Sequence, residues 1–163
     1  MKIAILSDTH NNLTNLDNAL TCIRLAKVNT VIHCGDMTTP ETARHLDGFQ
    51  VHFVYGNGDF ASGEIRETLQ ALNPASSAEM LFTGNIAGTR IAALHGHIPG
   101  QLEELVESRL YEFIFLGHSH RQRDVRMKDS RIINPGALGG MSREPRQFCL
   151  LDLATGKAEF IHI

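Results

Sequence analysis

Residues 3–10 read Ile3-Ala4-Ile5-Leu6-Ser7-Asp8-Thr9-His10, a continuous apolar run that ends in a polar cluster. A short run of this kind is typical of a strand that is buried on both faces. The arrangement recurs twice downstream, where residues 30–33 lead to Gly35-Asp36 and residues 51–55 lead to Gly56-Asn57-Gly58-Asp59. Polar side chains therefore follow each predicted strand directly.

Helices are predicted between these strands. Apolar side chains recur at helical spacing over residues 13–28, where Thr14 and Asp17 resemble an N-terminal cap pair. Residues 40–46 and 64–72 are also predicted to be helical. Alternation of strands and helices is typical of a largely parallel sheet that helices cover.

The second half of the chain is richer in strands. Strands are predicted over residues 80–83, 90–94, 113–116, 125–127, 132–133, 148–153 and 158–161, with hairpin connections at 85–88 and 154–157 and one helix at 101–110. A mixed or second sheet is therefore expected. The predicted fold class is α/β (α+β), with two mixed β-sheets packed as a sandwich and helices outside. No linker or internal repeat divides residues 1–163, which predicts one domain.

Composition excludes some classes of function. The chain has 163 residues, 42% of them hydrophobic, and a formal charge of −3, so strong binding to nucleic acid or to a membrane is not expected. Seven arginines are concentrated in the last third: Arg109, Arg121, Arg123, Arg126, Arg131, Arg143 and Arg146. A solvated surface explains most of them, and a sharper hypothesis is that one or two contact an anionic substrate.

Cysteine usage and the first residues bear on location. Three cysteines without a CxxC pair indicate a reducing compartment. The apolar run after Met1 ends too early for a signal peptide, and no stretch approaches the length of a membrane span. A cytoplasmic location is predicted.

Seven side chains at strand ends form a candidate metal site. They are Asp8, His10, Asp36, Asn57, His95, His118 and His120. Ligands of open α/β sheets bind beyond the carboxyl ends of the strands, so these side chains are expected on one rim. Each motif alone is weak, since Gly-Asp after a strand is commonly only a turn. Together they supply the nitrogen and oxygen donors that divalent metals take, in a number that suits two adjacent ions.

The ordered motifs resemble those of the calcineurin-like metallophosphoesterase superfamily. The residues that carry the resemblance are Asp8-x-His10, Gly35-Asp36, Gly56-Asn57, His95 and Gly117-His118-Ser119-His120; Gly56-Asn57-Gly58-Asp59 and Asn134-Pro135-Gly136 resemble its small microbial phosphodiesterase branch. The resemblance implies a phosphoric diester hydrolase in which a hydroxide bridging two divalent metals attacks the phosphodiester.

The resemblance also implies how the donors are divided. One metal is expected on Asp8, His10, Asp36 and His120, and the other on Asp36, Asn57, His95 and His118, with Asp36 shared between them. Donors without a thiolate suit Mn²⁺, Fe, Ni²⁺, Zn²⁺ or Co²⁺ better than Ca²⁺, and Mn²⁺ is the first choice by resemblance.

One position departs from the family pattern. Many members have a histidine directly after the Gly-Asn pair, where it serves as general acid to the leaving alkoxide or stabilises the phosphate, whereas this chain has Gly58. His97 or solvent is then left to protonate the leaving group. Asp59, which would orient such a histidine, is left to anchor its loop or a neighbouring ligand. His97 and Arg121 adjoin the motifs and are the predicted substrate contacts. The alternatives are a supporting or solvated histidine and a surface arginine.

Three functions are weighed. The leading hypothesis is a phosphodiesterase that acts on a small phosphodiester. A second is a protein-binding scaffold of the same fold, as in a retromer subunit of the superfamily, and a third is a phosphomonoesterase. All seven donor positions are retained, which favours an enzyme, while Gly58 leaves room for the scaffold. The substrate remains open, and a homo-oligomer is compatible with the sequence.

Overall fold

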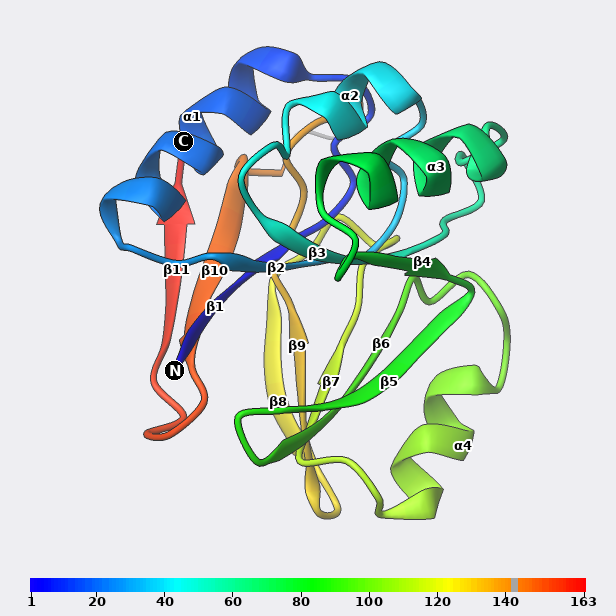
Figure 1. Ribbon diagram of the computed structural model, residues 1–163. Helices are drawn as coiled ribbons and strands as arrows, with labels where there is room; N and C mark the ends of the chain where they lie inside the picture. Colours follow the sequence, from blue (N-terminus) through cyan, green and yellow to red (C-terminus); the bar gives the residue numbers. More distant parts are fainter. Residues whose placement is uncertain (142–143) are drawn as a thin grey trace.

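The computed structural model describes residues 1–141 and 144–163, so Arg143 lies outside the described residues. Two β-sheets face each other, with helices on their outer sides (Figure 1). The first sheet has the strand order β11 (Ala158–His162), β10 (Gln147–Asp152), β1 (Lys2–Leu6), β2 (Thr30–His33), β3 (Gln50–Val54) and β4 (Ser77–Glu79). The second has the order β5 (Leu81–Ile86), β6 (Thr89–Leu94), β7 (Phe113–Phe115), β9 (Ser130–Asn134) and β8 (Arg123–Met127).

Strand direction brings the carboxyl ends of the central strands together. In the first sheet β1, β2, β3 and β4 run parallel, β10 is antiparallel to β1, and β11 is antiparallel to β10. In the second sheet β6, β7 and β9 run parallel, and β5 and β8 are the antiparallel edges. Each sheet is mixed, which confirms the predicted fold class.

Three apolar layers hold the structure together. Helices α1 (Leu13–Leu25), α2 (Pro40–Arg44) and α3 (Ser62–Leu72) cover the outer face of the first sheet, and α4 (Gln101–Ser108) covers the second (Figure 1). Side chains of β1 alternate between layers, since Leu6 packs under the helices while Ile5 packs between the sheets. Burial on both faces explains the continuous apolar run with which the sequence begins.

The predicted elements overlap observed ones, with two differences. The predicted cap of α1 is wrong. Asn12 is the N-cap and its side chain accepts a hydrogen bond from the Asn15 N–H, so Thr14 and Asp17 do not form the cap pair. The strand β4 was not predicted, because its three residues Ser77–Glu79 are too few to show a period.

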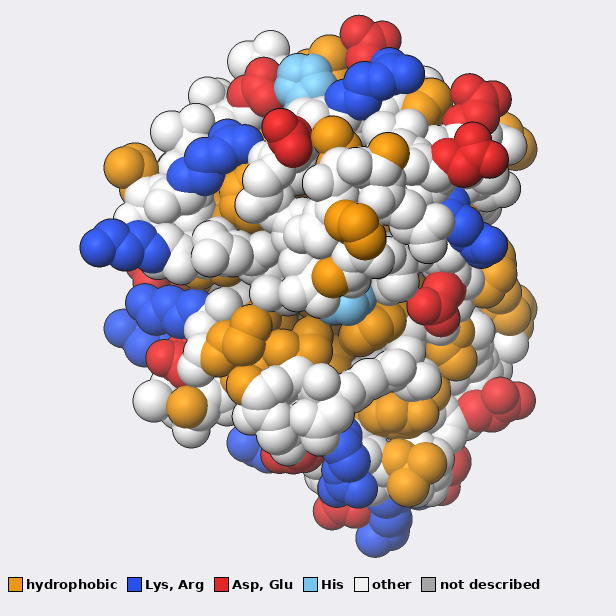
Figure 2. Space-filling model, in the orientation of Figure 1, with side chains coloured by type: hydrophobic (Ala, Val, Ile, Leu, Met, Phe, Trp, Pro, Cys, Tyr) orange, Lys and Arg blue, Asp and Glu red, His pale blue; other side chains and the backbone are white. Residues whose placement is uncertain are grey.

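Charge on the surface is mixed. On the face shown in Figure 2, basic and acidic side chains are interspersed rather than gathered into a field of one sign. No helix in the described part of the chain is both long and apolar enough to span a membrane.

Two leucines of α1 test the packing of this layer. Leu20 is fully buried, whereas Leu25 is 79% exposed. Leu20→Ala is expected to lower the free energy of unfolding by about 2–5 kcal/mol, because it leaves a cavity between α1 and the sheet. Leu25→Ala is the matched control, with an expected change below about 0.5 kcal/mol. Urea unfolding followed by circular dichroism measures both, and equal losses would contradict the packing described.

Candidate metal centre

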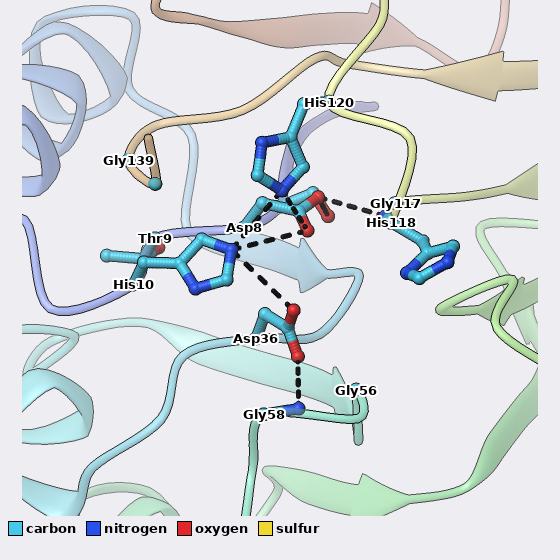
Figure 3. Close-up of polar contacts among 12 residues, drawn as sticks. Asp8, Thr9, His10, Asp36, Gly56, Gly58, Gly117, His118, His120 and Gly139 are labelled. Atoms are coloured by element: carbon cyan, nitrogen blue, oxygen red, sulfur yellow. Dashed lines mark hydrogen bonds and ion pairs between the residues drawn. The ribbon is translucent and has the colours of Figure 1, made fainter. Parts of the chain in front are cut away.

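The seven predicted donors lie at the carboxyl ends of five parallel strands. Asp8 and His10 follow β1, Asp36 follows β2, Asn57 follows β3, His95 follows β6, and His118 and His120 follow β7. The structure brings donors of both sheets together at one rim, and Figure 3 shows several of them around Asp8 and Asp36. Strands far apart in the sequence thus deliver side chains to one place.

The first group of donors is Asp8, His10 and His120. Asp8 Oδ1 lies 3.2 Å from His120 Nε2 and 3.8 Å from His10 Nε2, and the two imidazole nitrogens are 3.3 Å apart (Figure 3). Asp8 is fully buried, and its Oδ1 has no hydrogen-bond partner among the described residues. A buried carboxylate oxygen without a hydrogen-bond partner is costly, so these three side chains fit a divalent cation.

The second group is centred on Asp36. Its Oδ2 lies 3.5 Å from His95 Nε2 and 3.6 Å from His10 Nε2, so this carboxylate stands between the two groups. His95 Nε2 is also 3.1 Å from Asn57 Oδ1. Ligand atoms of Asp8, Asp36 and His95 lie within 4.8 Å of one another, as do those of Asp8, His10 and His120. The described donors therefore fit two neighbouring cations.

Hydrogen bonds set the state of the donors. His95 Nδ1 lies 2.7 Å from the Cys34 carbonyl and donates to it, which leaves Nε2 as the nitrogen that faces Asp36 and could bind a metal. Burial opposes ionisation of Asp36, but His95, the Gly58 N–H and His10 outweigh it and lower the pKa of this carboxyl to about 2. Burial also disfavours the charged form of His95, yet Asp36 and the Cys34 carbonyl prevail and raise its pKa.

Asp59 fastens the loops that carry Asp36 and Asn57. Its carboxylate accepts from three backbone N–H groups, those of Asp36 at 2.8 Å, Gly56 at 2.6 Å and Thr38 at 2.7 Å. Asp59 therefore anchors its loop, which is one of the two roles predicted for it in the absence of a histidine at position 58. The link sets the distance between the ends of β2 and β3.

Three further residues support the donors, and two of them, Ser7 and His33, were not among the predicted site residues. The Ser7 hydroxyl lies 2.5 Å from Asp8 Oδ2, and His33 Nε2 lies 2.8 Å from the Thr9 hydroxyl. Burial lowers the pKa of His33 to about 4, so this ring is neutral at pH 7. The Asn134 amide donates to the Gly117 carbonyl at 2.7 Å, in the Asn-Pro-Gly segment that the resemblance had marked. Neither Ser7 nor His33 carries a signal in its sequence context.

The two predicted substrate contacts lie in different surroundings. The ring of His97 lies 5.4 Å from that of His95 and 6.3 Å from that of His118, and its Nδ1 is buried without a hydrogen-bond partner among the described residues. The Arg121 side chain is 78% exposed and its Nε lies 3.4 Å from Glu144. Its role stays a prediction, and the structure turns it toward Glu144 rather than toward the donors.

An open cleft of about 1010 Å³ lies over the donors. Its walls come from both sheets and from the start of α1: His10, Asn11, Asn12, Leu13, Thr14, Asp36, Asn57, His118, His120, Gly140 and Met141. Arg121 is not among these described lining residues. A cleft of this size admits a small ester together with water.

Known proteins resemble this chain in sequence and in fold. Residues 1–156 match the model of the calcineurin-like phosphoesterase superfamily domain. A phosphodiesterase of Methanocaldococcus jannaschii is 31% identical over 86% of each chain, and a probable metallophosphoesterase of Mycoplasma pneumoniae is 28% identical over 96% of this chain and 92% of its own. The solved structure of an archaeal phosphodiesterase superposes with a TM-score of 0.94 at 29% identity, over all of both chains.

Asp59 offers a test of how the site is held. Asp59→Asn replaces one carboxylate oxygen by an amide nitrogen that cannot accept from the backbone. We expect the free energy of unfolding to fall by about 1–3 kcal/mol, because a buried N–H loses its partner. Asp47→Asn, at an exposed position, is the control. Thermal or urea unfolding measures both, and an unchanged stability of Asp59→Asn would contradict the anchoring role.

Proposed function

Because this chain belongs to the calcineurin-like phosphoesterase superfamily, we propose that it is a metal-dependent phosphodiesterase that cleaves its substrate in the cleft above the seven donors. The observation that carries the proposal is the buried, unpartnered Asp8 Oδ1 among imidazoles that point their Nε2 atoms toward it. A scaffold for protein binding has no need of such an arrangement, and every donor position is retained.

The donors divide between two cations. We assign Asp8, His10, Asp36 and His120 to one ion and Asp36, Asn57, His95 and His118 to the other. When bound, divalent ions of this kind acidify water and neutralise charge on phosphoryl oxygens. Nitrogen and oxygen donors without sulfur suit Mn²⁺, our first choice, as well as Fe, Ni²⁺, Zn²⁺ or Co²⁺.

The protein contributes position and charge. Asp36 is held by the Gly58 N–H at 2.7 Å, and His118 donates its backbone N–H to Asp8 Oδ2 at 3.1 Å (Figure 3). These bonds fix the carboxylates before substrate arrives, so little reorganisation is needed during the reaction. His97 adjoins His95 and His118, and we assign it the contact with a phosphoryl oxygen. Its Nδ1, which has no hydrogen-bond partner among the described residues, supports this assignment.

The cysteines and the cleft bear on the location of the protein and on the class of its substrate. Three free thiols, two of them buried, support a cytoplasmic location. The substrate is a small phosphodiester, because the cleft is open but its described walls carry no arginine or lysine for a long polyanion. A phosphomonoesterase is less favoured for the same reason, since a dianionic phosphate gains most from such cations.

His118 provides the direct test. His118→Ala is expected to lower kcat/KM for bis(p-nitrophenyl) phosphate with Mn²⁺ by about 100-fold or more, because loss of groups that merely support a metal ligand already costs about 10–100-fold. His162→Ala, at an exposed position of β11, is the matched control and should keep the wild-type rate. Full activity of folded His118→Ala would refute the assignment.

The absence of a histidine at position 58 predicts how the rate depends on the leaving group. Without an imidazole to protonate the departing oxygen, kcat/KM should fall steeply as the pKa of the leaving phenol rises. A series of methyl aryl phosphodiesters with Mn²⁺ measures this slope. A flat dependence, with the chemical step shown to be rate-limiting, would mean that a protein group donates the proton.

A further inference from the structure

A second pocket adjoins the cleft on the other side of His118. Its volume is about 370 Å³, and it lies between the loop that joins β6 to α4 and the loop that follows β7. Four apolar side chains form much of its lining: Ile98, Pro99, Leu102 and Leu116. We call it the side pocket. None of the proposed metal ligands lines it except His118.

His118 connects the side pocket with the cleft. This residue lines both spaces, so the two spaces adjoin at His118. The loop after β6 contributes to both sides as well, since His95 faces Asp36 while Gly96 and Ile98 face the side pocket. A group attached to a phosphate held beside His118 therefore has the side pocket within reach.

The chemistry of the side pocket selects the group. Glu103 lines it and disfavours a second anion, while Arg123, its one described cationic side chain, already lies 3.4 Å from the Met127 sulfur. Apolar walls with a few polar atoms at the edge, such as the Ser119 hydroxyl, are typical of sites for flat rings. The volume is at the lower end of the range of about 300–1,000 Å³ for small-molecule sites, which suits one ring system.

We propose that the side pocket binds an uncharged aromatic or heteroaromatic ring on the ester arm that stays with phosphorus after cleavage. The inference rests on the proposed function and narrows its substrate class to phosphodiesters with one ring-bearing arm. Ile98 is the residue to test, because its side chain is 38% exposed and its replacement should not disturb the core. Leu110, 52% exposed and outside the side pocket, is the matched control.

The experiment compares two substrates that share one leaving group. Phenyl p-nitrophenyl phosphate and methyl p-nitrophenyl phosphate differ only in the retained arm. With Mn²⁺, Ile98→Ser is expected to reduce the ratio of their kcat/KM values, phenyl over methyl, by about five- to tenfold, because part of the apolar wall is lost. Ile98→Trp, which fills the side pocket, should reduce the ratio as well, while Leu110→Ser should leave it unchanged.

A binding measurement tests the side pocket without requiring the protein to hydrolyse the ligand. Calorimetry with methylphenylphosphinate and dimethylphosphinate, which are not hydrolysed, should show the same loss of preference for the ring in both Ile98 variants. Wild-type ratios in both folded Ile98 variants, for hydrolysis and for binding, would overturn the side-pocket proposal and leave the phosphodiesterase standing. If the Mn²⁺-loaded wild type cleaves neither diester, the proposed function fails and this inference fails with it.

Discussion

The backbone carbonyl of Cys34 joins the two sheets at the rim that carries the donors. It accepts from the Ser7 hydroxyl at 3.0 Å and from His95 Nδ1 at 2.7 Å, so it bonds to groups that belong to different sheets. The next residue must be glycine, because a Cβ at Gly35 would lie 2.5 Å from His95 Nδ1. This contact fixes both the tautomer of His95 and its distance from Asp36, on which the second group of donors depends.

The backbone of the site is itself strained. Five of the predicted ligands have positive φ although none is glycine: Asp8 at 52°, His10 at 45°, Asp36 at 55°, His118 at 65° and His120 at 58°. Each such residue costs about 1–3 kcal/mol and persists only where its surroundings over-determine it. Backbone bonds from Asp8 to Gly35 and from His10 to Asp36, both 2.9 Å, supply that restraint. The strained backbone of the rim thus fixes where the carboxylates and imidazoles begin, at the ends of strands from both sheets.

Buried strands and strand-end donors were predictable, because burial on both faces leaves continuous apolar runs and parallel strands end at one edge. The supporting contacts were not. His33 lies inside a strand, where its sequence context does not distinguish it from other polar residues, yet its Nε2 lies within hydrogen-bonding distance of the Thr9 hydroxyl. The cap of α1 was misjudged because Asn12 lies one residue before the apolar period and competes with Thr14 for the same role. Such choices depend on three-dimensional neighbours that a local pattern does not record.

Gly58 ties the geometry of the site to its chemistry. A Cβ at this position would lie 3.0 Å from Asp36 Oδ1, while the backbone N–H donates to that same oxygen at 2.7 Å. The backbone at position 58 therefore lies close against Asp36, and its N–H positions the carboxylate that both groups of donors share. A side chain at position 58 would require Asp36 to shift by a few tenths of an ångström. With no histidine at this position, we expect the rate to depend on the stability of the departing anion, and selection among substrates to depend on contacts with the arm that remains on phosphorus.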